Sequence, residues 1–98
     1  MSERTWSLYE FEEGRDAWVQ KEGPADELYN IVTTWFPTLG DDPYREALQM
    51  TNEVPSFWFV RVPNSQDEHG HIVTCTYWID ERYGSVRCYD FTTYNLPR

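Results

Sequence analysis

The clearest pattern of apolar and polar positions runs from residue 24 to residue 36. Apolar side chains recur there at intervals of three and four residues, at Leu28, Ile31, Val32 and Trp35. This spacing places them on one side of an α-helix and leaves the polar residues on the other. Pro37 follows, and the residue before a proline disfavours the helical conformation. We therefore predict an amphipathic helix near residues 25–36.

A second, shorter helix is predicted near residues 42–51. Asp42 can accept hydrogen bonds from the free N–H groups of a first helical turn, and Pro43 suits the first helical position. The buried side of this helix would consist of Tyr44, Ala47 and Leu48.

The C-terminal half has the alternation of β-branched and aromatic residues that is typical of strands. It covers residues 57–62, 71–79 and 85–94. Turn-forming residues separate the last two segments, with Gly84 at the left-handed position of a short hairpin loop. We predict a three-stranded antiparallel meander, with the two helices covering one of its faces.

Residues 5–20 are compatible with two structures. The first half of this segment fits a twisted strand, and residues 17–19 would form its hairpin partner after a turn at residues 12–15. The alternative is a helix that starts at Ser7, with Glu10 completing a capping box. The hairpin is the favoured interpretation.

These elements together predict a single α+β domain over residues 1–98, with two layers and a predominantly antiparallel sheet. Aromatic residues make up 17% of the chain, so a few buried rings can stabilise its core despite a mean hydropathy of -0.73. No apolar run approaches the ~20 residues that cross a bilayer, and the first residues lack an apolar signal segment. We therefore expect a cytoplasmic protein without a membrane partner.

The net charge of -9 gives the clearest indication of function. A field of this sign opposes binding to nucleic acids and attracts proteins with a basic face. The exception would be a strand face on which Arg61 and Arg87 align beside Tyr89 or Trp58. Solubility and a composition bias of the whole proteome are the competing explanations for the acidity. The leading hypothesis is a non-enzymatic binding module, of the inhibitor, immunity or adaptor type, that engages a protein with a basic surface.

Three pairs of adjacent carboxylates are the candidate partner-binding residues. They are Glu12-Glu13, Asp41-Asp42 and Asp80-Glu81. All three pairs fall in predicted turns, where neighbouring carboxylates usually form a solvated surface. If the turns that carry Asp80-Glu81 and Glu12-Glu13 converge, they would make an acidic edge suited to Arg and Lys side chains of a partner.

The alternative hypothesis is a small-molecule binding or catalytic domain with an aromatic-lined pocket between helices and sheet. Trp58 and Trp78 fall on neighbouring predicted strands and could flank such a pocket, because partly exposed tryptophans often mark binding sites. Packing in the core is the competing interpretation for both. The chain contains no phosphate-binding loop, dinucleotide fingerprint or nucleophile elbow, so we identify no catalytic residue and expect no cofactor.

Histidines and cysteines complete the candidate chemistry. His69 and His71 are weak metal-ligand candidates beside Asp67 and Glu68, but no further ligand stands at a characteristic spacing, so we expect no metal site. Cys75 and Cys88 are predicted mid-strand and diagonal to each other, which suits core packing better than a disulfide or a nucleophile.

Overall fold

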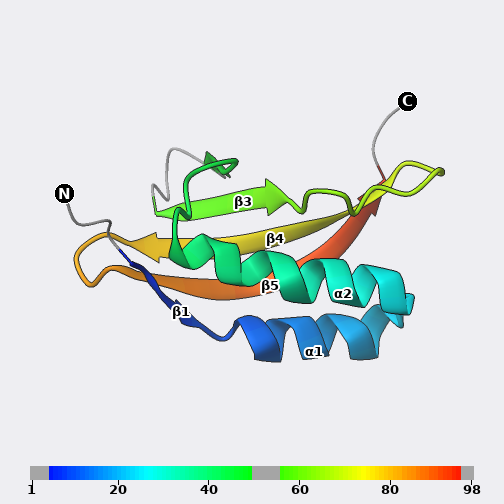
Figure 1. Cartoon of the computed structure of the whole chain (residues 1–98), viewed down its shortest axis with the longest axis horizontal. Coiled ribbons are helices and arrows are strands. Elements are labelled where there is room, and N and C mark those ends of the chain that lie inside the picture. Colours follow the sequence, from blue (N-terminus) through cyan, green and yellow to red (C-terminus); the bar gives the residue numbers. More distant parts are fainter. Residues whose placement is uncertain (1–4, 50–55, 96–98) are drawn as a thin grey trace.

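A computed structural model describes residues 5–49 and 56–95. Two helices, α1 (Phe11–Glu22) and α2 (Asp26–Trp35), precede a 3-10 helix, η1 (Phe36–Gly40). A five-stranded sheet has the spatial order β1-β5-β4-β3-β2 (Figure 1). The strands are β1 (Ser7–Tyr9), β2 (Leu48–Gln49), β3 (Phe57–Arg61), β4 (His71–Asp80) and β5 (Ser85–Asn95). The α+β class is thereby confirmed.

The sheet is mixed, so the prediction of a predominantly antiparallel sheet is wrong. β3 pairs antiparallel with β4, and β4 pairs antiparallel with β5. β1 instead runs parallel to β5, with Ser7 opposite Ser85 and Tyr9 opposite Arg87. Two strands can pair in parallel only when a long connection, here one that contains the helices, separates them in the chain. A short hairpin loop joins antiparallel strands only.

The predicted N-terminal hairpin is therefore also wrong. The segment 17–19 lies within α1 and not in a strand, and the helix begins at Phe11 rather than at Ser7. Glu10 precedes it with a φ of 66°, a left-handed conformation that turns the chain from β1 into α1. The amphipathic helix predicted near residues 25–36 is confirmed as α2.

The second predicted helix, near residues 42–51, is not formed in its described part. Residues 43–46 are in turns, and Leu48–Gln49 pair with β3 as β2. Asp42 does accept a hydrogen bond from the backbone N–H of Tyr44 at 3.0 Å, but no helix follows this local turn. Residues 50 and 51 lie outside the described part.

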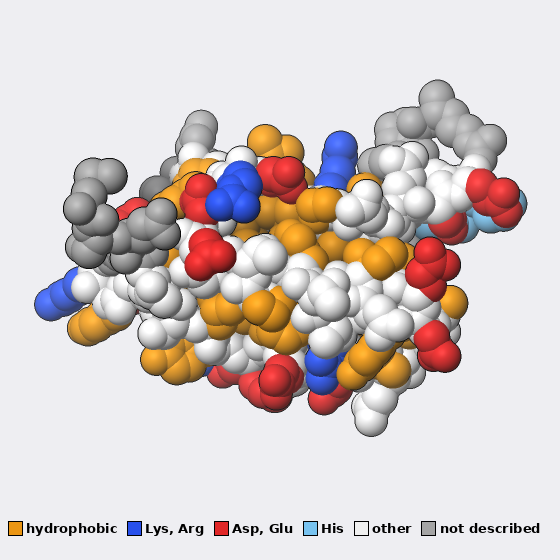
Figure 2. Space-filling view, viewed as in Figure 1, with side chains coloured by type: hydrophobic (Ala, Val, Ile, Leu, Met, Phe, Trp, Pro, Cys, Tyr) orange, Lys and Arg blue, Asp and Glu red, His pale blue; other side chains and the backbone are white. Residues whose placement is uncertain are grey.

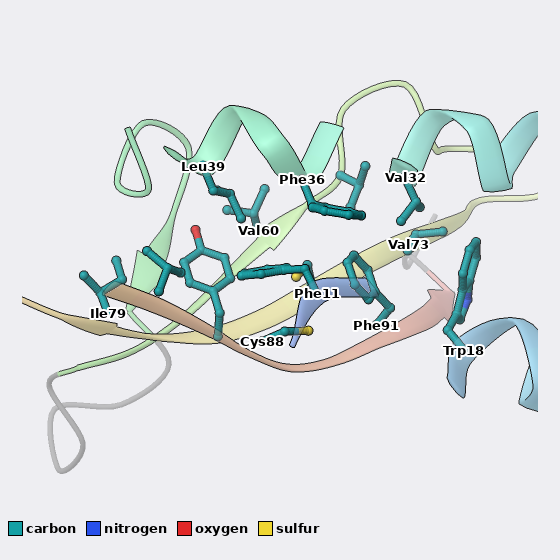
Figure 3. Packing of buried hydrophobic residues seen from close by; sticks show 14 of the residues in the cluster. Phe11, Trp18, Val32, Phe36, Leu39, Val60, Val73, Ile79, Cys88 and Phe91 are labelled. Atoms are coloured by element: carbon teal, nitrogen blue, oxygen red, sulfur yellow. The ribbon is translucent and has the colours of Figure 1, made fainter. Parts of the chain in front are cut away.

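Both helices pack on the same face of the sheet, where the core lies (Figure 3). Phe11 of α1 stacks on Phe36 at 5.6 Å between ring centroids and contacts Tyr77 and Phe91 of the sheet. Trp18, about two turns further along α1, packs against Phe91 and donates its indole N–H to Thr93. The helices thus leave the opposite face of the sheet, here called the open face, without a covering helix among the described residues.

An irregularity in β5 changes which residues face the core. Tyr77 pairs with Cys88, while its neighbour Thr76 pairs with Asp90, so Tyr89 is an extra residue in the strand. This β-bulge places Cys88 and Phe91 on the core face and leaves the Tyr89 ring on the open face.

Candidate functional site

A row of four side chains crosses the open face at one level of the sheet. Strand pairing aligns Phe57 with Trp78, Trp78 with Arg87, and Arg87 with Tyr9. Directly paired residues lie on the same face of a sheet, so the row runs across β3, β4, β5 and β1. We call these four residues the open-face row.

Aromatic contacts hold Trp78 in place within this row. Its ring lies 4.9 Å from the Phe57 centroid and 5.3 Å from that of Tyr89, the latter at an interplanar angle of 85°. Phe57 and Tyr89 also touch each other, at 5.4 Å. Edge-to-face contacts at such distances are favourable. The indole of Trp78 is therefore held in a partly exposed position before any ligand arrives.

Arg87 is compensated within the chain. Its guanidinium lies 2.6 Å from a carboxylate oxygen of Glu10 and 5.4 Å from the centroid of the Tyr9 ring. Arg61 and Tyr89 share the open face with Arg87, whereas Trp58 faces the helices. Arg61 pairs with Thr74 and Arg87 with Trp78, so the two arginines are four residues apart along β4 and do not align side by side. Arg87 is also already paired with an acid.

An open hollow of about 470 Å³ lies between the open-face row and the β4–β5 turn. It is lined by Tyr9, Trp78, Asp80, Tyr83, Ser85 and Arg87. Asp80 accepts a hydrogen bond from the backbone N–H of Tyr83 at 3.3 Å. Within residues 5–49 and 56–95, no Lys or Arg side chain forms a salt bridge with Asp80. The hollow therefore combines three aromatic walls with an exposed carboxylate.

The structure brings two of the three predicted acidic pairs to one end of the molecule. Tyr44 donates a hydrogen bond to each pair: its backbone N–H donates to Asp42, and its hydroxyl donates to Glu81. The start of β1 links the same segments, because successive N–H groups of this stretch donate to the carbonyls of Gly40 and Gly84. Asp41-Asp42 and Asp80-Glu81 are therefore close in space although some forty residues separate them.

Glu12-Glu13 is placed differently from its prediction. The pair forms the first turn of α1 and not a connecting turn, and both side chains are exposed. Carboxylates at this position interact favourably with the positive end of the helix dipole. A local structural role thus accounts for this pair.

Trp58 and Trp78 lie on opposite faces of the sheet, so they do not flank a pocket between helices and sheet. Trp58 pairs with Tyr77, a core residue, and its ring contacts Tyr44 at 5.2 Å. Trp78 belongs to the open-face row. Both border one open hollow around the end of β4, which also includes Tyr44, Asp80 and Glu81. A smaller hollow of about 200 Å³ beside η1 has Trp35 as its aromatic wall.

The histidine segment forms a self-contained loop. The Asp67 carboxylate accepts hydrogen bonds from the backbone N–H groups of His69 and His71, at 2.9 and 2.8 Å, and lies 2.8 Å from Nδ1 of His71. Within the described residues, no three His, Cys, Asp or Glu side chains are grouped as a metal site would require. The His71 backbone N–H and the other hydrogen bonds lower the pKa of Asp67 to about 2.

Titration of this loop provides a test of its geometry. The ordinary pKa of the Asp67 group is 3.8 and the folded value is lower, so the stabilisation is present above pH 3.8 and is lost as the pH falls through about 2. We expect the Asp67 carboxyl carbon and the His71 amide proton to titrate together near pH 2 by NMR. Asp67→Asn should abolish the transition at the amide. A carboxyl midpoint near 3.8 would contradict the hydrogen-bonded loop.

Both cysteines are buried on the core face of the sheet. Cys75 pairs with Phe91 and Cys88 with Tyr77, so the two thiols are diagonal neighbours, as predicted. Burial, with the nearby Cys88 thiol, raises the pKa of Cys75. A buried thiol of raised pKa is a poor nucleophile, which agrees with a packing role.

Sequence reasoning missed Tyr9, Tyr83 and Arg87 as members of the site. Tyr9 joins it only through the parallel pairing of β1, which local patterns did not indicate. Arg87 could have been found, because the hairpin register predicted from Gly84 places it opposite Trp78. No family model, curated protein or solved structure matches the chain.

Proposed function

We propose that this protein is a non-enzymatic binding module that engages a protein with a basic surface. The observation that carries the proposal is the convergence of Asp41-Asp42 and Asp80-Glu81 at one end of the molecule. Tyr44 links the two segments in a chain of net charge -9, and within the described residues Arg45, 3.9 Å from Asp42, is the one Lys or Arg side chain that forms a salt bridge with any of these four acids. An acidic surface accelerates association with a positively charged partner and opposes nucleic acids and anionic membranes.

Surface character supports a macromolecular partner over a small-molecule or catalytic role. Acidic side chains occur in several groups over the face shown in Figure 2, with few basic ones between them. Asp80 and Glu81, which border the hollows around the β4–β5 turn, are exposed. Acid–base catalysis by a carboxyl group generally needs a shielded site that raises its pKa. No helix in the described part of the chain is long and apolar enough to span a membrane.

A charge-neutralised variant tests the proposal. Asp41→Asn, Asp80→Asn and Glu81→Gln together remove three negative charges and keep side-chain size, while Asp42 is left to bond Tyr44. We expect the immobilised wild-type protein to capture basic proteins from native lysate and to release them as salt rises, because exposed charges are screened. The triple variant should lose most of this capture, measured by quantitative mass spectrometry.

A matched control separates the acidic surface from net charge alone. The control variant carries Asp16→Asn, Asp26→Asn and Glu27→Gln, which remove the same number of negative charges from exposed positions on α1 and α2. This control should retain the captured proteins. Equal losses in both variants, or capture that is insensitive to salt, would contradict the proposal.

A further inference from the structure

We infer that the hollow beside Trp78 is the recognition pocket for an arginine side chain of the basic partner. This inference rests on the proposed function and names the site and the chemical group that it would take. The guanidinium would lie against the Trp78 ring, within the hollow that Tyr83 also lines, and donate hydrogen bonds to the Asp80 carboxylate.

The local charge around the hollow favours a cation. Its two ionised lining groups are Asp80 and Arg87. The Arg87 charge is compensated by Glu10 at 2.6 Å, whereas Asp80 has no Lys or Arg partner within the described residues. The adjacent Glu81 and Arg82 have opposite charges and leave the local sum unchanged, so the negative charge comes from Asp80. The hollow therefore carries net negative charge, complementary to a guanidinium.

The aromatic walls supply the second part of such a site. Cations are attracted to the faces of Trp and Tyr rings, and arginine forms this contact more often than lysine. Two of the three rings already hold guanidinium groups of this chain: Arg82 lies 5.4 Å from the Tyr83 centroid, and Arg87 lies 5.4 Å from that of Tyr9. The third ring, Trp78, is fixed by Phe57 and Tyr89 and has no such cation among the described contacts. We therefore place the incoming guanidinium at Trp78.

Arginine fits the pocket better than lysine for a geometric reason. A planar guanidinium can stack on the indole and still present two N–H groups to one carboxylate. A lysine ammonium is a compact, strongly hydrated charge that forms no stacked contact. A single-stranded nucleic acid could also use exposed rings, but it needs compensating positive charge, and the hollow supplies the opposite.

Titration with short peptides tests the inference directly. The probe is a hexa-arginine peptide, followed by the five indole N–H resonances in a nitrogen-15 NMR spectrum. We expect the indole resonance of Trp78 to shift in a saturable manner. That of Trp18, whose indole N–H donates a hydrogen bond to Thr93, should not shift. A hexa-lysine peptide should bind more weakly, and a ten-nucleotide oligothymidylate should not shift Trp78.

Conservative variants identify the groups responsible. Asp80→Asn keeps an oxygen for the Tyr83 backbone N–H, and Tyr83 is 72% exposed, so Tyr83→Ala does not disturb the core. Each should weaken hexa-arginine binding about two- to fivefold, and the pair about tenfold. The matched controls Asp26→Asn and Tyr94→Ala change the same groups at exposed positions elsewhere and should leave the affinity unchanged.

The possible failures are distinguishable from failure of the proposed function. The affinity for hexa-arginine could be unchanged by Asp80→Asn and Tyr83→Ala but lost in Asp41→Asn. This result would contradict the arginine pocket and still agree with binding to a basic partner. A shift of Trp78 by the oligothymidylate, or equal affinity for hexa-lysine, would also overturn it. If neither basic peptide binds, the arginine pocket is rejected. The proposed function is then tested separately, by the capture of basic proteins from lysate with the wild-type protein and the triple variant.

Discussion

Phe11→Ala is expected to lower the free energy of unfolding by about 3–5 kcal/mol. Phe11 is only 2% exposed and contacts rings from three other elements: Phe36 of η1, Tyr77 of β4 and Phe91 of β5. Removing it takes away apolar burial and leaves a cavity between α1 and the sheet. Small domains have total stabilities of about 5–15 kcal/mol, so the loss is a large fraction of the whole.

Urea unfolding followed by fluorescence measures this effect through the transition midpoint. Tyr83→Ala is the control, because it removes an aromatic ring that is 72% exposed, and its cost should stay within about 0.5 kcal/mol. A decrease in the free energy of unfolding of less than about 1.5 kcal/mol for Phe11→Ala would mean that α1 is not anchored to the sheet through its first residue.

Gly14→Ala is expected to destabilise the protein although alanine is the better helix former. In an exposed helix this change would stabilise by about 1 kcal/mol. Here a Cβ on Gly14 would lie 2.7 Å from Sγ of Cys88, well inside van der Waals contact. Cys88 is buried in β5, so either its thiol must rotate into the surrounding core or the helix and strand must move apart. Overpacking of this kind costs about 1–3 kcal/mol.

A double-mutant cycle isolates the contact. Cys88→Ala removes the sulfur, so Gly14→Ala should become neutral or stabilising in that background, with a coupling of about 0.5–3 kcal/mol. Gly23→Ala is the control: its Cβ would meet nothing within 4 Å, and its cost arises from a φ of 57°, which Cys88→Ala cannot relieve. Additive effects of Gly14→Ala and Cys88→Ala would show that the close approach is absent.

Gly14 and Gly84 show where local sequence patterns mislead and where they do not. In the sequence, Gly14 with its acidic neighbours indicates a turn, yet it lies inside α1. Its lack of a side chain serves the close packing of α1 on Cys88 and not a change of chain direction. Gly84 does have a positive φ, of 62°, in the β4–β5 turn, where the sequence predicted the left-handed position. A glycine indicates a turn when its backbone has a positive φ, as at Gly84. It does not indicate a turn when it is needed for close packing against another element, as at Gly14.

Part of the candidate site followed from sequence and part did not. Trp78, Asp80 and Glu81 were identified because exposed aromatics and paired acids are informative residue types in themselves. The sequence analysis did not infer that Trp78 and Trp58 lie on opposite faces of the sheet. The register shows this, because Trp58 pairs with Tyr77, the neighbour of Trp78. The convergence of Asp41-Asp42 with the β4–β5 turn depends on Tyr44, a contact between segments distant in the chain.

The elements that could be predicted from the chain alone are those with a periodic and local signal. The stripe of α2 and the alternation in β3, β4 and β5 each depend on which side of one element is buried, so neighbouring residues carry the information. Long-range contacts determine the parallel pairing of β1, the helix at Phe11–Glu22 and the short strand β2. Each of these depends on a partner distant in sequence. Burial against β5 stabilises α1 despite its weak apolar periodicity, and pairing with β3 holds Leu48–Gln49 extended, where local signals favour a helix.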